Sequence, residues 1–139
     1  DTHELKEWII KPELLEPIKP LLNAGMIFEA IVLMLNNISA NSVFYKKALK
    51  LEGAVTFNQI AMKCVYEMFM NIINEKSTGK KSKYRWLTPE VISTYYAQSL
   101  CFITEGWIAQ GMDDIEPKEM AEAYMYLITR SMDDILSEL

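Results

Sequence analysis

Apolar residues recur three and four positions apart through most of this chain, from Met26 to Leu136. This spacing places side chains on one face of an α-helix. A sustained alternation of apolar and polar residues between turn signals, the pattern of a half-buried strand, is not found. The sequence therefore predicts an all-α fold.

Local start and stop signals divide this pattern into helices. Thr56 and Gln59 have the spacing of a capping box, in which each side chain bonds a free backbone N–H of the first turn. Thr88-Pro89-Glu90 combines a cap, a proline at the first helical position and an acid near the positive end of the helix dipole. We predict helices over residues 26–39, 43–51 with a stop near Gly53, 57–73, 88–110 with an end at Gly111, and 117–136.

The first 25 residues differ from the rest because they contain Pro12, Pro17 and Pro20. Proline within a helix removes a hydrogen bond and clashes with the preceding turn. We expect a short helix over His3–Ile10, then turns that Gly25 closes. The predicted organisation is an irregular lead-in over residues 1–25 and a helical domain over residues 26–139, interrupted by an exposed basic loop from Lys76 to Arg85.

The last two predicted helices carry apolar stripes wider than one neighbouring helix needs. The short link Gly111–Glu116 makes these helices antiparallel neighbours. Two such hairpins around a two-fold axis would form a dimeric four-helix bundle. Burial of both stripes within one chain is the alternative, which the pattern leaves open. The expected dimer residues are Tyr96, Ser99, Leu100, Ile103, Ala121, Tyr124, Met125, Ile128 and Met132.

Composition narrows the class of protein. Half of the 139 residues are hydrophobic, which suits one domain with a sizeable core. The net charge of −5 argues against a nucleic-acid-binding domain, whose phosphate contacts need a basic face. The polar start lacks a signal peptide, and the longest apolar run, Ala30–Leu35, is far shorter than the ~20 residues that span a bilayer. Cys64 and Cys101 lie in apolar patterns, so we expect a cytoplasmic protein without membrane contact.

Catalytic and metal-binding patterns are not found in the sequence. His3, the single histidine, lies beside the first residue with no partner for a catalytic triad. Asp113, Asp114 and Glu116 lack the spacing of a calcium loop and are interpreted as a solvated turn. We therefore expect neither an enzyme nor a bound cofactor or metal.

Three segments of the chain carry a recognisable pattern. Residues 95–112 combine small and apolar residues with Trp107 and a terminal Gly111. The other two segments are Glu116-Pro117-Lys118-Glu119-Met120-Ala121 and Asn41-Ser42-Val43-Phe44-Tyr45-Lys46-Lys47-Ala48-Leu49. In this order the three segments resemble the penultimate helix, the start of the last helix and, in one branch, an earlier stretch of the C-terminal domain of tetracycline-repressor (TetR) type transcription regulators. The resemblance covers about residues 26–136.

The resemblance implies a homodimeric bacterial regulator that senses a small apolar or amphipathic effector in this domain. Such regulators bind DNA through a separate N-terminal helix-turn-helix domain. Residues 1–25 contain no basic recognition helix. DNA contact would then occur only through a domain outside this chain, and the resemblance leaves open whether one precedes Asp1.

An effector site in such a domain would be an apolar cavity between helices with a few polar groups. The nine methionines would give it a deformable lining. The alternative, that these residues simply fill a core, stays open, as does a helical protein-interaction module with no small-molecule ligand. The candidate ligand-binding residues are Phe28, Met34, Phe44, Phe57, Met62, Tyr66, Met68, Tyr95, Phe102 and Trp107.

Overall fold

The computed structural model describes residues 14–50 and 56–139, and within these ranges it contains helices and no strand. The all-α prediction is confirmed. The helix expected over His3–Ile10 and the stop at Gly53 lie outside the described residues. The helices are α2 (Lys19–Asn23), α3 (Ile27–Ala40), α4 (Ser42–Lys50), α5 (Phe57–Lys76), α6 (Pro89–Ala109), α7 (Pro117–Thr129) and α8 (Met132–Ser137).

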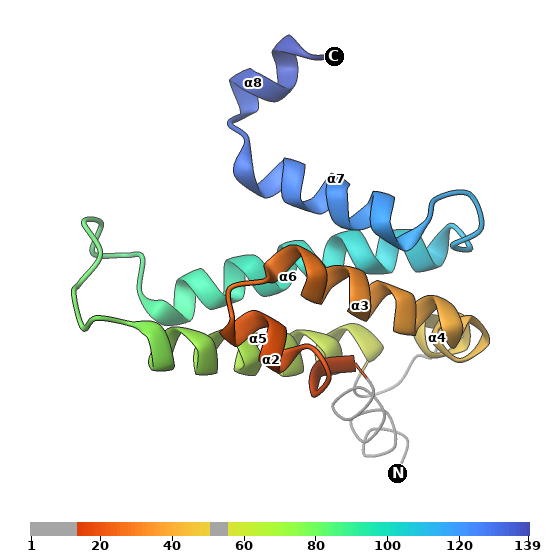
Figure 1. Ribbon diagram of the computed structural model, residues 1–139, viewed down its shortest axis with the longest axis horizontal. Helices are drawn as coiled ribbons and strands as arrows, with labels where there is room; N and C mark the ends of the chain where they lie inside the picture. Colours follow the sequence, from red (N-terminus) through yellow and green to blue (C-terminus); the bar gives the residue numbers. More distant parts are fainter. Residues whose placement is uncertain (1–13, 51–55) are drawn as a thin grey trace.

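The two longest helices, α5 and α6, lie side by side in opposite directions and form the most extensive helix–helix contact among the described elements. Figure 1 shows α3 in front of this pair, α7 on the α6 side and α4 at one end. α7 packs mainly against α3 and also contacts α6, whereas α8 points away from the other helices.

Helix starts follow the local signals in the sequence. Thr56 Oγ1 accepts a hydrogen bond from the Gln59 amide at 3.2 Å, and the Gln59 side chain accepts one from the Thr56 amide at 2.8 Å. This reciprocal pair is the predicted capping box. Thr88 Oγ1 likewise accepts from the Val91 amide at 3.3 Å, directly before Pro89 in the first turn of α6. Both predicted starts are confirmed.

The link between α6 and α7 is held by a backbone turn and a tryptophan. Gly111 follows the helix with φ of +97°, a left-handed conformation that glycine adopts without a steric penalty. The Trp107 indole is 3% exposed, and its Nε1 donates to the Ile115 carbonyl at 2.8 Å. This bond ties the link to the end of α6, which directs α7 back across the molecule.

Two helix predictions differ from the structure. The single helix expected over residues 117–136 is wrong, because Arg130 is extended (φ −109°, ψ 147°) and ends α7. Ser131 Oγ then accepts from the Asp134 amide at 3.1 Å and begins α8. In the lead-in, where turns were expected, α2 forms with a proline in its first turn, a position that needs no N–H donor.

The hydrophobic core is shared by α2 to α7. Residues that precede Met26 contribute to it: Leu14, Leu15, Ile18 and Leu22 are all buried. The described part of the lead-in therefore packs against the rest of the chain.

No helix in the described ranges is by itself long and apolar enough to cross a bilayer. α3 and α4 reach that length and composition only as a pair, and they are bent by 87° at the break between them.

The first prediction concerns the Trp107 hydrogen bond. Trp107→Phe should lower the free energy of unfolding by about 1–3 kcal/mol, because it leaves the Ile115 carbonyl without its donor and removes part of a buried ring. Trp86→Phe is the matched control, since Trp86 is 75% exposed and should change stability by about 0.5 kcal/mol or less. Urea unfolding followed by circular dichroism measures both, and equal effects would contradict the assignment.

Candidate functional site

The candidate site is an apolar cavity of about 460 Å³ that lies between α2, α3, α5, α6 and α7 and opens to solvent. Ligand pockets in proteins measure roughly 300–1,000 Å³ and are mostly apolar, so this cavity suits a small molecule. It is lined by Ile18, Leu22, Gly25, Ile27, Ala30, Ile31, Met34, Met68, Phe69, Ile72, Lys76, Tyr96, Leu100, Tyr124, Met125, Ile128 and Thr129.

Of the described residues that line this cavity, Lys76 is the charged one. Its Nζ donates to the Asn23 carbonyl at 2.6 Å and to the Leu22 carbonyl at 3.3 Å. These bonds join the last residue of α5 to the end of α2. Because Lys76 is exposed and still lines the cavity, it lies where the cavity meets solvent.

A small hydrogen-bond network holds α7 against α6 beside the cavity. The Tyr124 hydroxyl and Ser99 Oγ lie 2.8 Å apart, and Ser99 Oγ donates to the Tyr96 carbonyl at 2.9 Å. Burial raises the pKa of Tyr124, and the bond to Ser99 offsets part of this rise. The phenol therefore stays neutral, and its hydroxyl is used within the protein.

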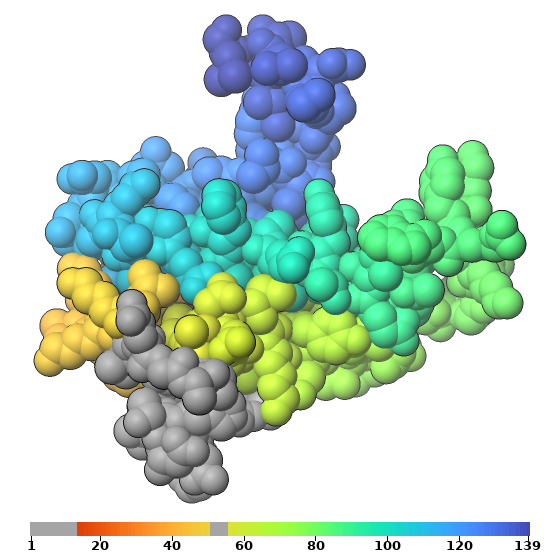
Figure 2. All heavy atoms as spheres, turned by 180° about the vertical axis from the view of Figure 1, so that it is seen from behind, coloured from red at the N-terminus to blue at the C-terminus, as the bar shows by residue number. Residues whose placement is uncertain are grey.

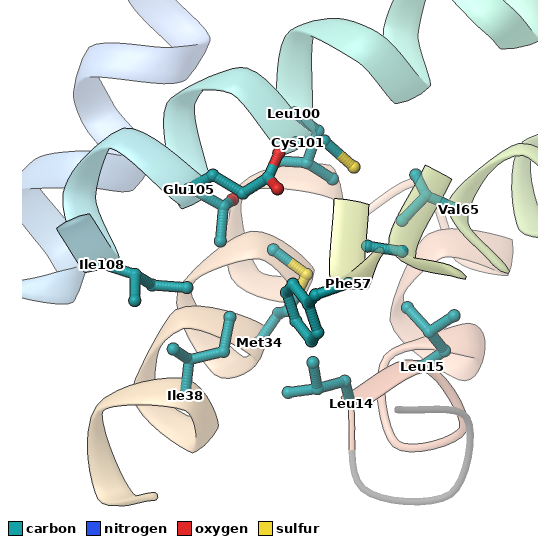
Figure 3. Close-up of a pocket in the computed structure, with 12 residues that line it drawn as sticks. Leu14, Leu15, Met34, Ile38, Phe57, Val65, Leu100, Cys101, Glu105 and Ile108 are labelled. Atoms are coloured by element: carbon teal, nitrogen blue, oxygen red, sulfur yellow. The ribbon is translucent and has the colours of Figure 1, made fainter. Parts of the chain in front are cut away.

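A second cavity, shown in Figure 3, measures only about 40 Å³. Leu14, Met34 and Phe57 meet there, with Cys101 and Glu105 approaching from α6. It is too small for an organic effector, so the larger cavity is the stronger candidate.

Ionisable groups beside the small cavity favour their neutral forms. Burial raises the pKa of the Cys101 thiol to about 12, with further contributions from the Glu105 and Cys64 charges. Burial also raises the pKa of Glu105, although Asn58 Nδ2 donates to its carboxylate at 2.6 Å and lowers it in part. A thiol with so high a pKa is a poor nucleophile at neutral pH. In the described ranges, no group of three or more His, Cys, Asp or Glu side chains is placed to hold a metal ion.

The predicted ligand-binding residues are not brought to one place. Met34 and Met68 line the large cavity, while Met34 and Phe57 line the small one. Tyr95 and Phe102 are 63% and 75% exposed on α6. Trp107 is buried at the end of α6. The remaining four, Phe28, Phe44, Met62 and Tyr66, are partly buried against the core.

Most residues expected at the dimer interface face the interior of their own chain. Leu100, Ala121 and Tyr124 are buried. Five of the expected residues line the large cavity: Tyr96, Leu100, Tyr124, Met125 and Ile128. Ser99 and Ile103 are partly buried, and Met132 is 73% exposed.

Several residues that line the cavity were not predicted from the sequence. Ile18 and Leu22 were placed in the irregular lead-in, although their spacing of four is helical. Lys76 was assigned to a basic loop, but it is the last residue of α5. Ile72 precedes it by four positions, a signal that both side chains share one helix face.

The arrangement of α3 to α7 around this cavity can be compared with known proteins. The family described as transcriptional regulator C-terminal region, of the TetR type, matches residues 26–130. The chain belongs to this family. In this TetR-family chain, the matched residues include helices α3 to α7. Four of the five helices that line the cavity therefore lie within the matched range. Searches of curated proteins and of solved structures found no match.

The second prediction concerns the partly buried carboxylate. Glu105→Gln should keep an acceptor for Asn58 while removing a charge that burial disfavours. Since the pKa of Glu105 is raised in the folded state, wild type loses stability as pH rises through that pKa, and the variant does not. The variant should therefore be the more stable protein at pH 7.

Urea unfolding across a pH series measures this difference. It should shrink as pH falls toward the ordinary glutamate pKa of about 4.3. Glu122→Gln changes an exposed glutamate and serves as the control. A pH-independent difference for Glu105→Gln would show that charge burial is not its cause.

Proposed function

We propose that this chain is the effector-binding and homodimerisation region of a TetR-family transcriptional regulator. The observation that carries the proposal is the 460 Å³ apolar cavity between α2, α3, α5, α6 and α7. Its effector would be a small apolar or amphipathic molecule. The proposal includes no catalytic role, and the expected setting is the bacterial cytoplasm.

The proposed mechanism is a shift between two arrangements of the helices that line the cavity. An effector that binds one arrangement more tightly increases its population. DNA binding would occur through a helix-turn-helix domain outside residues 1–139. Coupling of the two sites is then reciprocal, so DNA and effector change each other's affinity by the same factor.

Exposed apolar side chains on the last helices support a homodimer. Tyr95 and Phe102 lie seven positions apart on α6, and so share one face. Leu127 on α7 is 47% exposed, and Met132 and Leu136 on α8 are more exposed still. The C-terminal segment projects from the body in both Figure 1 and Figure 2. A second copy related by a two-fold axis would cover these side chains.

A protein-interaction module is the second candidate function. An open hollow at the start of α6, lined in part by Trp86, Leu87 and Tyr95, favours it. Such a module has no need of an apolar cavity between helices, and the 460 Å³ cavity therefore favours the effector-binding function.

The third prediction tests the cavity with 1-octanol, a neutral amphipathic probe. Ile72→Trp should weaken 1-octanol binding at least about tenfold, because the larger ring occupies cavity volume. Ile73→Trp is the matched control, since Ile73 is the adjacent residue and does not line the cavity. Isothermal titration calorimetry measures both. Equal binding by the two variants would place the probe elsewhere, and no binding to wild type would contradict the effector site.

The fourth prediction tests the dimer. Phe102→Glu should shift the chain toward monomer by about tenfold or more in dissociation constant, because a charge would be buried without a partner. Val43→Glu on α4 is a control at a similarly exposed residue away from the proposed face. Sedimentation equilibrium over a concentration series gives both constants. A wild-type monomer at high micromolar concentration would exclude this interface.

A further inference from the structure

The large cavity has a polarity gradient along α5. Met68, Ile72 and Lys76 are spaced four residues apart, which places them on one face of the helix. Met68 is 4% exposed, Ile72 is partly buried and Lys76 is exposed. A molecule in the cavity therefore meets hydrocarbon at its inner end and an ammonium group at its outer end.

The Lys76 ammonium has hydrogen-bonding capacity beyond its present contacts. An ammonium group carries three N–H donors. Two are directed to the Asn23 and Leu22 carbonyls, which are neutral acceptors. Among the described carboxylates none forms an ion pair with Nζ within 4.0 Å.

Among the residues that the structure describes, no acidic side chain lines the cavity, so none of them opposes the charge of Lys76 within it. The polar groups of α6 and α7 beside it are bonded to the protein itself: Tyr124 to Ser99, and Thr129 Oγ1 to the Met125 carbonyl at 2.6 Å. Lys76 is therefore the group best placed to select a ligand by charge.

We propose that the cavity binds an amphipathic monoanion whose carboxylate accepts a hydrogen bond from Lys76 and whose hydrocarbon chain extends along α5 toward Met68. This inference rests on the proposed effector-binding function and assigns the chemical class of the effector. A lysine is a compact point charge, which matches a single negative charge. A phosphate monoester carries close to two charges and needs more donors than this cavity offers.

The test compares octanoate with 1-octanol, which share a hydrocarbon chain and differ in charge. Calorimetric titrations use the whole chain as wild type, Lys76→Gln and Lys76→Arg. Glutamine retains an amide donor for the α2 carbonyls but has no charge, and arginine retains the charge. Circular dichroism verifies that each variant keeps the helical content of wild type.

Wild type should bind octanoate, and Lys76→Gln should weaken that binding by about tenfold or more through loss of a charge-assisted bond. Binding of 1-octanol should change by about twofold or less, and Lys76→Arg should retain most of the octanoate affinity. Added salt should weaken octanoate binding in wild type only, because the head group is near solvent. Octyl phosphate should bind no more tightly than octanoate.

Three outcomes would overturn the inference in different ways. If octanoate and 1-octanol both bind and Lys76→Gln weakens neither, the cavity stands and the role of Lys76 is wrong. If neither probe binds wild type, the proposed effector site fails together with this inference. Tighter binding of octyl phosphate than of octanoate would contradict a single-charge site.

Discussion

The close packing of α5 against α6 is the constraint on which the remaining structure depends. The two helices approach where small side chains face each other: Cys64 of α5 lies near enough to Cys101 of α6 for the charge of one to affect the pKa of the other. Ser93 and Ala97, both fully buried, continue this row of small residues along α6. The distance between packed helices follows from the side chains at their contact. Because α2, α4 and α7 pack on this pair, and α3 packs on those three helices, the geometry of the pair determines where they meet and where a space remains.

The cavity depends on the position of α7, which specific hydrogen bonds fix in addition to hydrophobic packing. The Trp107 bond to the Ile115 carbonyl directs the link, and the Tyr124–Ser99 bond fixes the helix farther along. Between α7 and α5, the side chains of Met125 and Ile128 cover a space that they do not fill. Two specific hydrogen bonds thus hold α7 on α6 at a position that leaves this volume unfilled, although unfilled volume in a core costs stability.

Local features of the fold were predictable from the sequence, and features that depend on neighbouring helices were not. The capping box at Thr56 and the end of α6 near Gly111 involve residues a few positions apart, so short-range chemistry determines them. The start of α8 also had a local signal, because Ser131 caps the helix by accepting a hydrogen bond from the Asp134 amide. The apolar spacing continues through this point, and one unbroken helix was therefore predicted. A broad apolar stripe does not say which neighbour covers it. For this reason Tyr124 was expected at a dimer face and lies inside its own chain, and Lys76 was expected in a loop and lies at the cavity.

The position of Lys76 also indicates how occupation of the cavity would reach the N-terminal side of the chain. Lys76 is the last residue of α5, and its ammonium group donates hydrogen bonds to the Leu22 and Asn23 carbonyls at the end of α2. An anion at the same nitrogen partly neutralises the ammonium charge that strengthens those two bonds, or competes for the N–H donors that make them. Either change alters the balance between arrangements in which α2 is tied to α5 and those in which it is not. Ala24 and Gly25 separate α2 from α3, and α2 also packs against α3, so a shift of α2 would be transmitted to α3. A helix near the start of the described chain is thereby the element whose position an anionic effector would change most directly.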